Sequence, residues 1–138
     1  MALPQAPEAR LYYRAAKQRY DDALLLLEAG RTTGAVYMAG YAVECFLKAL
    51  VLAGVAQRLR KELLGGFRGS RAHSIEWLSA LYRRHAQGAI ARDVSRHLSR
   101  VATWTTDLRY LTGMLRRREA DEFMESVLAI MTWADGRM

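Results

Sequence analysis

The segment 34–53 is apolar over most of a helical circumference and is interrupted by the charged residues Glu44 and Lys48. Gly54 follows it as a helix stop. A helix that is apolar on nearly every side has to be surrounded by other elements in a water-soluble fold. Its unbroken apolar runs, such as residues 49–53, are shorter than the ~20 residues that a membrane-spanning helix needs. We therefore expect the central, most buried helix of a soluble domain, with no membrane as partner.

Helical spacing of apolar residues continues on both sides of this segment. The expected elements are a first helix from about Glu8 to Gly30 after an irregular N-terminus of residues 1–8, a third helix capped by Ser74 and interrupted by Gly88, a further helix from about Ala89 towards Arg109, and a last helix from Arg118 to about Ala134. No stretch alternates with a period of two for long enough to form a sheet. The sequence predicts a single all-α domain over residues 1–138, an up-and-down bundle of four to five helices.

Local features add three further expectations. Small residues at Ala35, Ala39, Gly40 and Ala42 permit close packing, and the first helix is the expected neighbour. Thr32 or Thr33 offers a hydroxyl cap for the central helix. Residues 55–73 contain Gly65, Gly66 and Gly69 and are expected to form a basic loop. The basic residues of this loop are Arg58, Arg60, Lys61, Arg68 and Arg71.

The charge balance favours polyanions as partners. The chain has 21 Lys and Arg against 14 Asp and Glu, a formal charge of +7. Arg83-Arg84 and residues 116–118 could form an electropositive surface together with the basic loop. The alternative is a basic surface that only keeps the protein soluble. Cys45 is the single cysteine, so no intramolecular disulfide can form, and a cytoplasmic location is expected.

Metal and phosphate-loop motifs are not evident. His73, His85 and His97 are spaced twelve apart, and the sequence has no CxxC, HxxxH or HExxH pattern. The glycines between residues 65 and 69 lack the Walker lysine spacing and a preceding strand. No metal and no cofactor are therefore predicted.

Several motifs agree in order and spacing with one known family. They are the run AGYAVECFLKAL over residues 39–50, then Gly54, a loop, His73 before an apolar helix, and later Arg109-Tyr110. This arrangement, from about residue 14 to residue 133, resembles the HEPN domain family. The resemblance implies a HEPN-like bundle that pairs as a homodimer. It also implies one of three roles: a nucleotide-binding module, a partner of a nucleotidyltransferase, or a metal-independent ribonuclease toxin of a toxin-antitoxin pair.

The ribonuclease members of that family resemble one another in an Arg and a following His with four to six residues between them. Such a pair suits strand cleavage, since His can move a proton while Arg stabilises the phosphate. Here the corresponding arginine is Arg109, and residues 114–116 stand where the histidine would fall. The same spacing occurs in Arg68 with His73. It also occurs in Arg92 with His97, whose side chains would point roughly 140° apart on a helix.

Glu44 and Lys48, four residues apart, have two interpretations. They are either an ion pair at the rim of the core, contributing about 0.3–0.5 kcal/mol, or part of a functional polar cluster. Arg109 is expected to reach Glu44 across the bundle. For His73, near the start of the third helix, packing or capping is expected.

The favoured hypothesis is a module without catalysis of its own that binds a nucleotide or RNA phosphate, docks a nucleotidyltransferase-type partner, or does both. The candidate binding residues are Glu44, Lys48, His73, Arg109, Tyr110, Arg68 and Arg71. One alternative is a ribonuclease toxin that uses Arg92 and His97. The other is a structural homodimer without a ligand.

Overall fold

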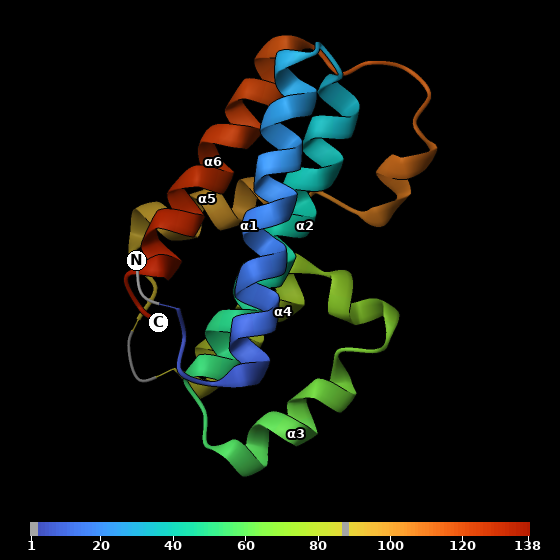
Figure 1. The fold of residues 1–138 in the computed structure, drawn as a ribbon. Coiled ribbons are helices and arrows are strands. Elements are labelled where there is room, and N and C mark those ends of the chain that lie inside the picture. The colour runs from blue at the N-terminus through green and yellow to red at the C-terminus, as the bar shows by residue number, and fades with distance from the viewer. Residues whose placement is uncertain (1–2, 87–88) are drawn as a thin grey trace.

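The computed structural model describes residues 3–86 and 89–138, and the described part contains helices and no strand (Figure 1). The helices are α1 (Pro7–Glu28), α2 (Thr32–Ala53), α3 (Gln57–Gly66), α4 (Ile75–His85), α5 (Arg92–Val101) and α6 (Arg117–Asp135), with 3₁₀ helices η1 (Ser70–His73) and η2 (Thr106–Tyr110). The predicted all-α bundle is confirmed. Gly88, expected to interrupt the third helix, lies outside the described residues.

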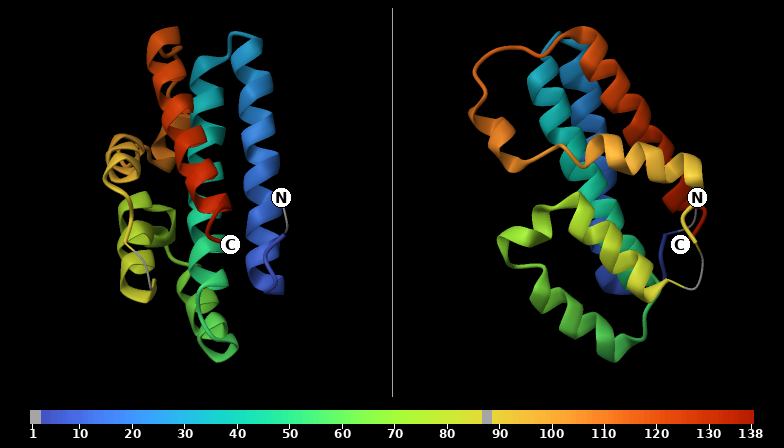
Figure 2. Two further views of the ribbon diagram at one scale, coloured as in Figure 1. Left: turned by 90° about the vertical axis from the view of Figure 1, so that its left-hand side faces the viewer. Right: turned by 180° about the vertical axis from the view of Figure 1, so that it is seen from behind.

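Helix α2 lies at the centre, as its apolar circumference predicts. It contacts α1, α4, α6 and η2. By length and composition α2 could cross a membrane, but 78% of its most apolar window is buried inside the molecule, which is the environment of a core helix. Figure 2 shows α1 on one side of α2 and the pair α4 and α5 on the other. Helix α5 crosses α2 and α6 steeply, so the bundle is not strictly up-and-down.

The hairpin of α1 and α2 turns at Gly30, whose φ of 78° is a conformation that favours glycine. On α1, Ala9, Ala16 and Ala23 recur every seven residues and are fully buried. Alanine at this spacing allows two helices to approach closely, because every second turn presents only a methyl group. Small residues therefore do allow α1 and α2 to approach closely, and the three alanines of α1 contribute to this close packing.

Gly40 has a different role from the one expected. A Cβ atom at this position would overlap the indole of Trp104, which follows α5. Gly40 therefore makes room for the segment after α5, and the assignment of this glycine to packing against the first helix was wrong. Trp104 is 5% exposed and fills the space left on α2.

Three boundaries also differ from the predictions. Residues 55–73, expected to be a loop, contain α3 and η1, and no α3 residue is buried. The helix expected from Ala89 towards Arg109 ends at Val101, since Trp104 turns inward and η2 follows. Thr32 and Thr33 lie inside α2 without capping it, although Ser74 does cap α4 by accepting from Trp77 N at 3.1 Å. The first and last helices match their expected ranges to within two residues.

The contact between Gly40 and Trp104 predicts the effect of a single added side chain. Gly40→Val should lower the free energy of unfolding by about 1–3 kcal/mol, because the extra atoms force the indole out of its site. Gly65→Ala is the matched control, since a Cβ there meets no atom within 4 Å and an alanine favours the helix. Urea denaturation measures the free energy of unfolding of both variants. A Gly40→Val protein as stable as the parent would show that the indole does not pack there.

Candidate functional site

One face of α2 carries a line of polar side chains. Tyr37, Tyr41, Glu44 and Lys48 follow one another at spacings of four, three and four, which places them on the same side of a helix. Glu44 and Lys48 are buried in the structure, with 5% of each side chain exposed. A charge in such a place requires a partner, because burial without one is strongly unfavourable.

Glu44 has two partners, one for each carboxylate oxygen. Lys48 Nζ donates to Oε2 at 2.8 Å, and His73 Nδ1 donates to Oε1 at 2.9 Å. The predicted pair of Glu44 with Lys48 is confirmed, although it lies in the core instead of at its rim. The expected pairing of Arg109 with Glu44 is wrong, since Lys48 and His73 occupy both oxygens. His73 lies in η1, so its bond attaches the segment before α4 to the central helix.

The ammonium group of Lys48 also lies between two aromatic rings. Its Nζ is 5.5 Å from the centroid of Tyr12 on α1 and 5.4 Å from that of Phe67 after α3. Both distances suit cation–π attraction, which is stronger when the cation has lost its water. The cluster of Glu44, Lys48 and His73 thus joins four segments of the chain.

Removing the carboxylate tests this cluster. Glu44→Ala should lower the free energy of unfolding by about 3–5 kcal/mol, because it leaves the Lys48 charge buried and uncompensated. Glu122→Ala is the control, since it breaks the exposed pair of Arg118 and Glu122, which has the same spacing. That change should stay within about 0.5 kcal/mol. If chemical denaturation showed that both variants lose the same free energy of unfolding, the buried pair would be contradicted.

Cys45, next to Glu44, is not a nucleophile in this arrangement. Burial, followed by the Glu44 carboxylate, raises the pKa of its thiol to about 11. The thiol is therefore protonated at neutral pH, and only the thiolate attacks or binds metal. In the described part of the chain, no three His, Cys, Asp or Glu side chains form a group that could hold a metal ion.

Towards the N-terminal end of α2 the polar line becomes aromatic. The hydroxyls of Tyr37 and Tyr41 are 3.2 Å apart, and the Tyr41 ring packs edge-on against Trp104 at 5.0 Å and His73 at 6.2 Å. Burial, aided by the Tyr37 hydrogen bond, raises the pKa of Tyr41 to about 12, while the Arg109 guanidinium acts in the opposite direction. Arg109 therefore lies close to these hydroxyls, and not beside Glu44.

The segment after η2 is held against the start of α2 by two threonines. Thr32 Oγ1 donates to Leu115 O at 2.6 Å, and Thr33 Oγ1 donates to Gly113 O at 2.8 Å. Thr33 Oγ1 also accepts from Leu115 N at 3.0 Å. In Figure 1 this segment, drawn in orange, leaves the body of the molecule and returns to the N-terminal end of α2.

A groove of about 330 Å³ lies between this segment and the start of α2, and we call it the Arg109 groove. Its lining residues are Leu26, Arg31, Thr33, Gly34, Tyr37, Leu108, Arg109, Leu111, Thr112, Gly113 and Met114. None of these carries a carboxylate. Neither Arg31 nor Arg109 forms an ion pair with any described residue, and the Arg109 guanidinium is 4.8 Å from the exposed ring of Tyr110. Two positive charges and several hydroxyls therefore converge on one open space.

Thr33→Val should loosen this segment, because valine keeps the shape of threonine but removes its hydroxyl. We expect faster hydrogen exchange at the Leu115 amide, whose proton Thr33 Oγ1 accepts. Thr112→Val is the control, since Thr112 lies in the same segment, is exposed and has no side-chain hydrogen bond to a described residue. Unchanged exchange at Leu115 in the Thr33 variant would show that the hydroxyl does not hold the segment.

The remaining candidate residues are scattered. Arg71 stacks on Trp77 at 5.1 Å, and Arg68 is exposed before η1. Arg92 is exposed at the start of α5, whereas His97 Nδ1 lies 2.9 Å from Ser126 Oγ on α6. No described hydrogen bond joins Arg92 to His97.

Sequence reasoning missed Arg31, Thr33 and Tyr37 as parts of a site. The spacing of Tyr37 with Tyr41, Glu44 and Lys48 on one helix face was a usable signal for Tyr37. No local pattern marks Arg31, because the groove also needs residues from 108–114, which reach it only in the folded chain.

One comparison with known proteins identifies the family. The model of the HEPN domain matches residues 9–137, which is nearly the whole chain. No curated protein and no solved structure matches it. The match covers the hairpin of α1 and α2, the cluster around Glu44 and the Arg109 groove, and on this evidence the chain belongs to the HEPN domain family.

Proposed function

We propose that this protein is a HEPN-family module that binds the phosphate of RNA or of a nucleotide in the Arg109 groove, without catalysis of its own. The proposal rests on one observation, which is whether the charged side chains of the groove have ion-pair partners. Arg31 and Arg109 line the groove without an ion pair to any residue that the structure describes, and no carboxylate is among its described lining residues. Guanidinium groups bind phosphate oxygens in a bidentate way and remain charged at any physiological pH.

Other features of the site support an anionic ligand. The Glu44 carboxylate is paired with Lys48 and hydrogen-bonded to His73 inside the core, so it does not compete with a ligand for the arginines. The hydroxyl of Tyr37 lies in the lining and can donate to a phosphate oxygen. Tyr110, 70% exposed beside Arg109, offers a ring on which a base can stack.

The positions of the histidines support the absence of catalysis. A metal-independent cleavage site needs a proton carrier next to a phosphate-binding arginine. His73 donates to Glu44 and His97 lies against Ser126, and neither histidine lines the Arg109 groove. The ribonuclease alternative with Arg92 and His97 gains no support from this geometry. A homodimer and a nucleotidyltransferase-type partner stay predictions of the family membership.

RNA binding tests the proposal directly. We expect fluorescently labelled single-stranded RNA to bind with an affinity that falls steeply with salt. Arg109→Gln and Arg31→Gln should each weaken binding about tenfold, as for the loss of one charged hydrogen-bonding group. Each should also reduce the slope of log affinity against log salt by about 0.7.

The control removes the same charge elsewhere. Arg58→Gln changes an exposed arginine on α3, at the opposite end of the molecule from the Arg109 groove (Figure 1). It should leave the affinity within about twofold of the parent. If all three variants lose affinity equally, binding follows overall charge and the proposed site is wrong. If the RNA is cut without metal and His97→Ala stops the cutting, the claim of no catalysis is wrong.

A further inference from the structure

A small pocket with apolar walls lies where α2, η2 and α6 meet, and we call it the Trp104 pocket. Its volume is about 230 Å³. Five apolar side chains form its walls: Val36, Trp104, Leu108, Leu115 and Phe123. No more than 9% of Val36, Trp104 or Phe123 is exposed, so most of this wall belongs to the core of the molecule.

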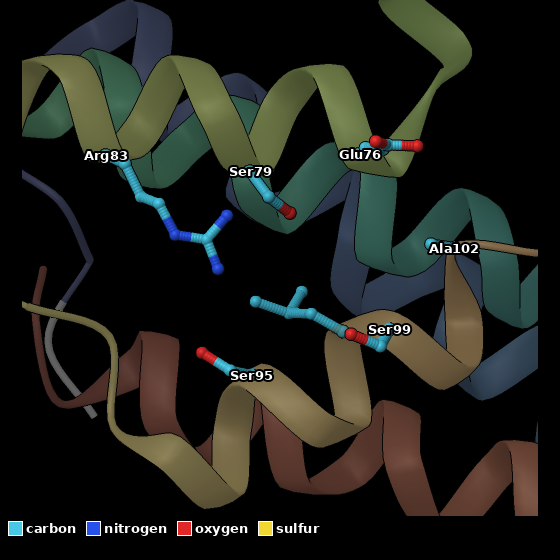
Figure 3. A pocket seen from close by; sticks show the side chains of 7 residues that line it. Glu76, Ser79, Arg83, Ser95, Ser99 and Ala102 are labelled. Carbon is cyan, nitrogen blue, oxygen red and sulfur yellow. The ribbon is translucent and has the colours of Figure 1, made fainter.

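This pocket differs from the groove between α4 and α5. That groove is lined mainly by polar side chains, and Figure 3 shows Arg83 reaching into its open space towards α5. Glu76 and Arg83 are exposed there, so water already satisfies both charges. The walls of the Trp104 pocket, by contrast, offer water few hydrogen bonds, and an apolar body that displaces this water is favoured.

The mouth of the Trp104 pocket has one charged group, the carboxylate of Glu119. The hydroxyls of Thr103 and Thr105 also line the mouth, but both already bind the backbone. Thr103 Oγ1 donates to Arg100 O at 3.1 Å, and Thr105 Oγ1 accepts from Asp107 N at 3.3 Å. Among the residues that the structure describes, Glu119 has no ion-pair partner.

The sequence of α6 explains why Glu119 has no such partner. The two other acids near the start of this helix each pair with an arginine one turn before them. The positions four residues before and after Glu119 are Leu115 and Phe123, which are apolar and line the same pocket. A carboxylate that is free to bind a ligand therefore lies directly beside an apolar wall.

We propose that the Trp104 pocket binds a small organic amine, which is a protonated amino group on an apolar body. The body fills the pocket, and the ammonium group donates to the Glu119 carboxylate. The rings of Trp104 and Phe123 favour a cation over a neutral group of the same size, because the faces of aromatic rings attract positive charge. The body has to be small, since the volume is below the usual range for drug-sized ligands.

This inference does not rest on the function proposed above. The amine has the opposite charge from the phosphate proposed for the Arg109 groove. The two spaces share only Leu108, which lines both. A ligand of either kind therefore leaves the charged group of the other site free.

Titration with phenethylamine tests the proposal, with the indole N–H signal of Trp104 in proton–nitrogen NMR spectra as the readout. We expect a saturable shift of this signal and smaller shifts for Trp77 and Trp133, which do not line the pocket. Phenethyl alcohol is the matched ligand, because it has the same apolar body without the charge. It should bind about tenfold more weakly, as for the loss of one hydrogen bond between charged groups. A salt concentration of about 0.15 M screens the net positive charge of the chain beyond about 8 Å.

Three variants locate the site. Glu119→Gln keeps the shape of the side chain and removes its charge, so it should bind the amine and the alcohol equally well. Glu125→Gln is the matched control, since Glu125 is exposed on the same helix and does not line the pocket. It should keep the preference of the parent for the amine. Arg109→Gln should also keep this preference, although it weakens RNA binding in the groove proposed above.

Absence of a saturable shift of the Trp104 signal would overturn the proposal, and so would equal affinities of the parent protein for the amine and the alcohol. Thermal melting of each variant separates a binding role of Glu119 from a structural one. If Glu119 only stabilises the start of α6 through the helix dipole, Glu119→Gln lowers the melting temperature and keeps the preference for the amine. That result would also overturn the proposal.

Discussion

The burial of Glu44 in the central helix is the constraint on which much of this structure depends. A carboxylate that is 95% buried has to be compensated where it lies, because its desolvation costs several kcal/mol. Lys48 from the same helix and His73 from η1 provide that compensation. Lys48 in turn needs the rings of Tyr12 and Phe67 around it. One charge thus determines how α1, the end of α3 and the start of α4 meet α2.

The same helix also positions the proposed binding surface. Towards the N-terminus of α2, the cluster around Glu44 is followed on the polar face by Tyr41 and Tyr37. The threonines that hold the segment after η2 come next. Gly40 admits Trp104, which directs the chain after α5 towards that segment. Arg109 is presented at the surface as a result of these contacts. The interior therefore uses its charges for stability, while the charges available to a ligand lie outside it.

The basic residues of the surface differ in how far their charge is already paired. The Arg109 groove has arginines and hydroxyls without an acid, which suits a polyanion that needs no particular orientation. Arg117 and Arg118, by contrast, are paired within α6 and contribute less free charge than their sequence suggests.

Local sequence determined the helices whose apolar residues repeat regularly. The ranges of α1, α2 and α6, the Ser74 cap and the central place of the segment around Glu44 follow from spacing and capping, which act between near neighbours. The pairing of Glu44 with Lys48 could be predicted for the same reason. Short α3 was assigned to a loop because Gly65 and Gly66 lie in its last turn, and glycine is unfavourable inside a helix.

Tertiary structure alone decided where the arginines lie. Arg31 and Arg109 are far apart in the sequence and line one groove only because Thr32 and Thr33 hold the segment after η2. Arg109 was expected to reach Glu44 across the bundle, but Lys48 and His73 already occupy both carboxylate oxygens of Glu44. The sequence determined which residues a helix presents on one face; which distant side chains meet across that face depends on the packing of the whole chain.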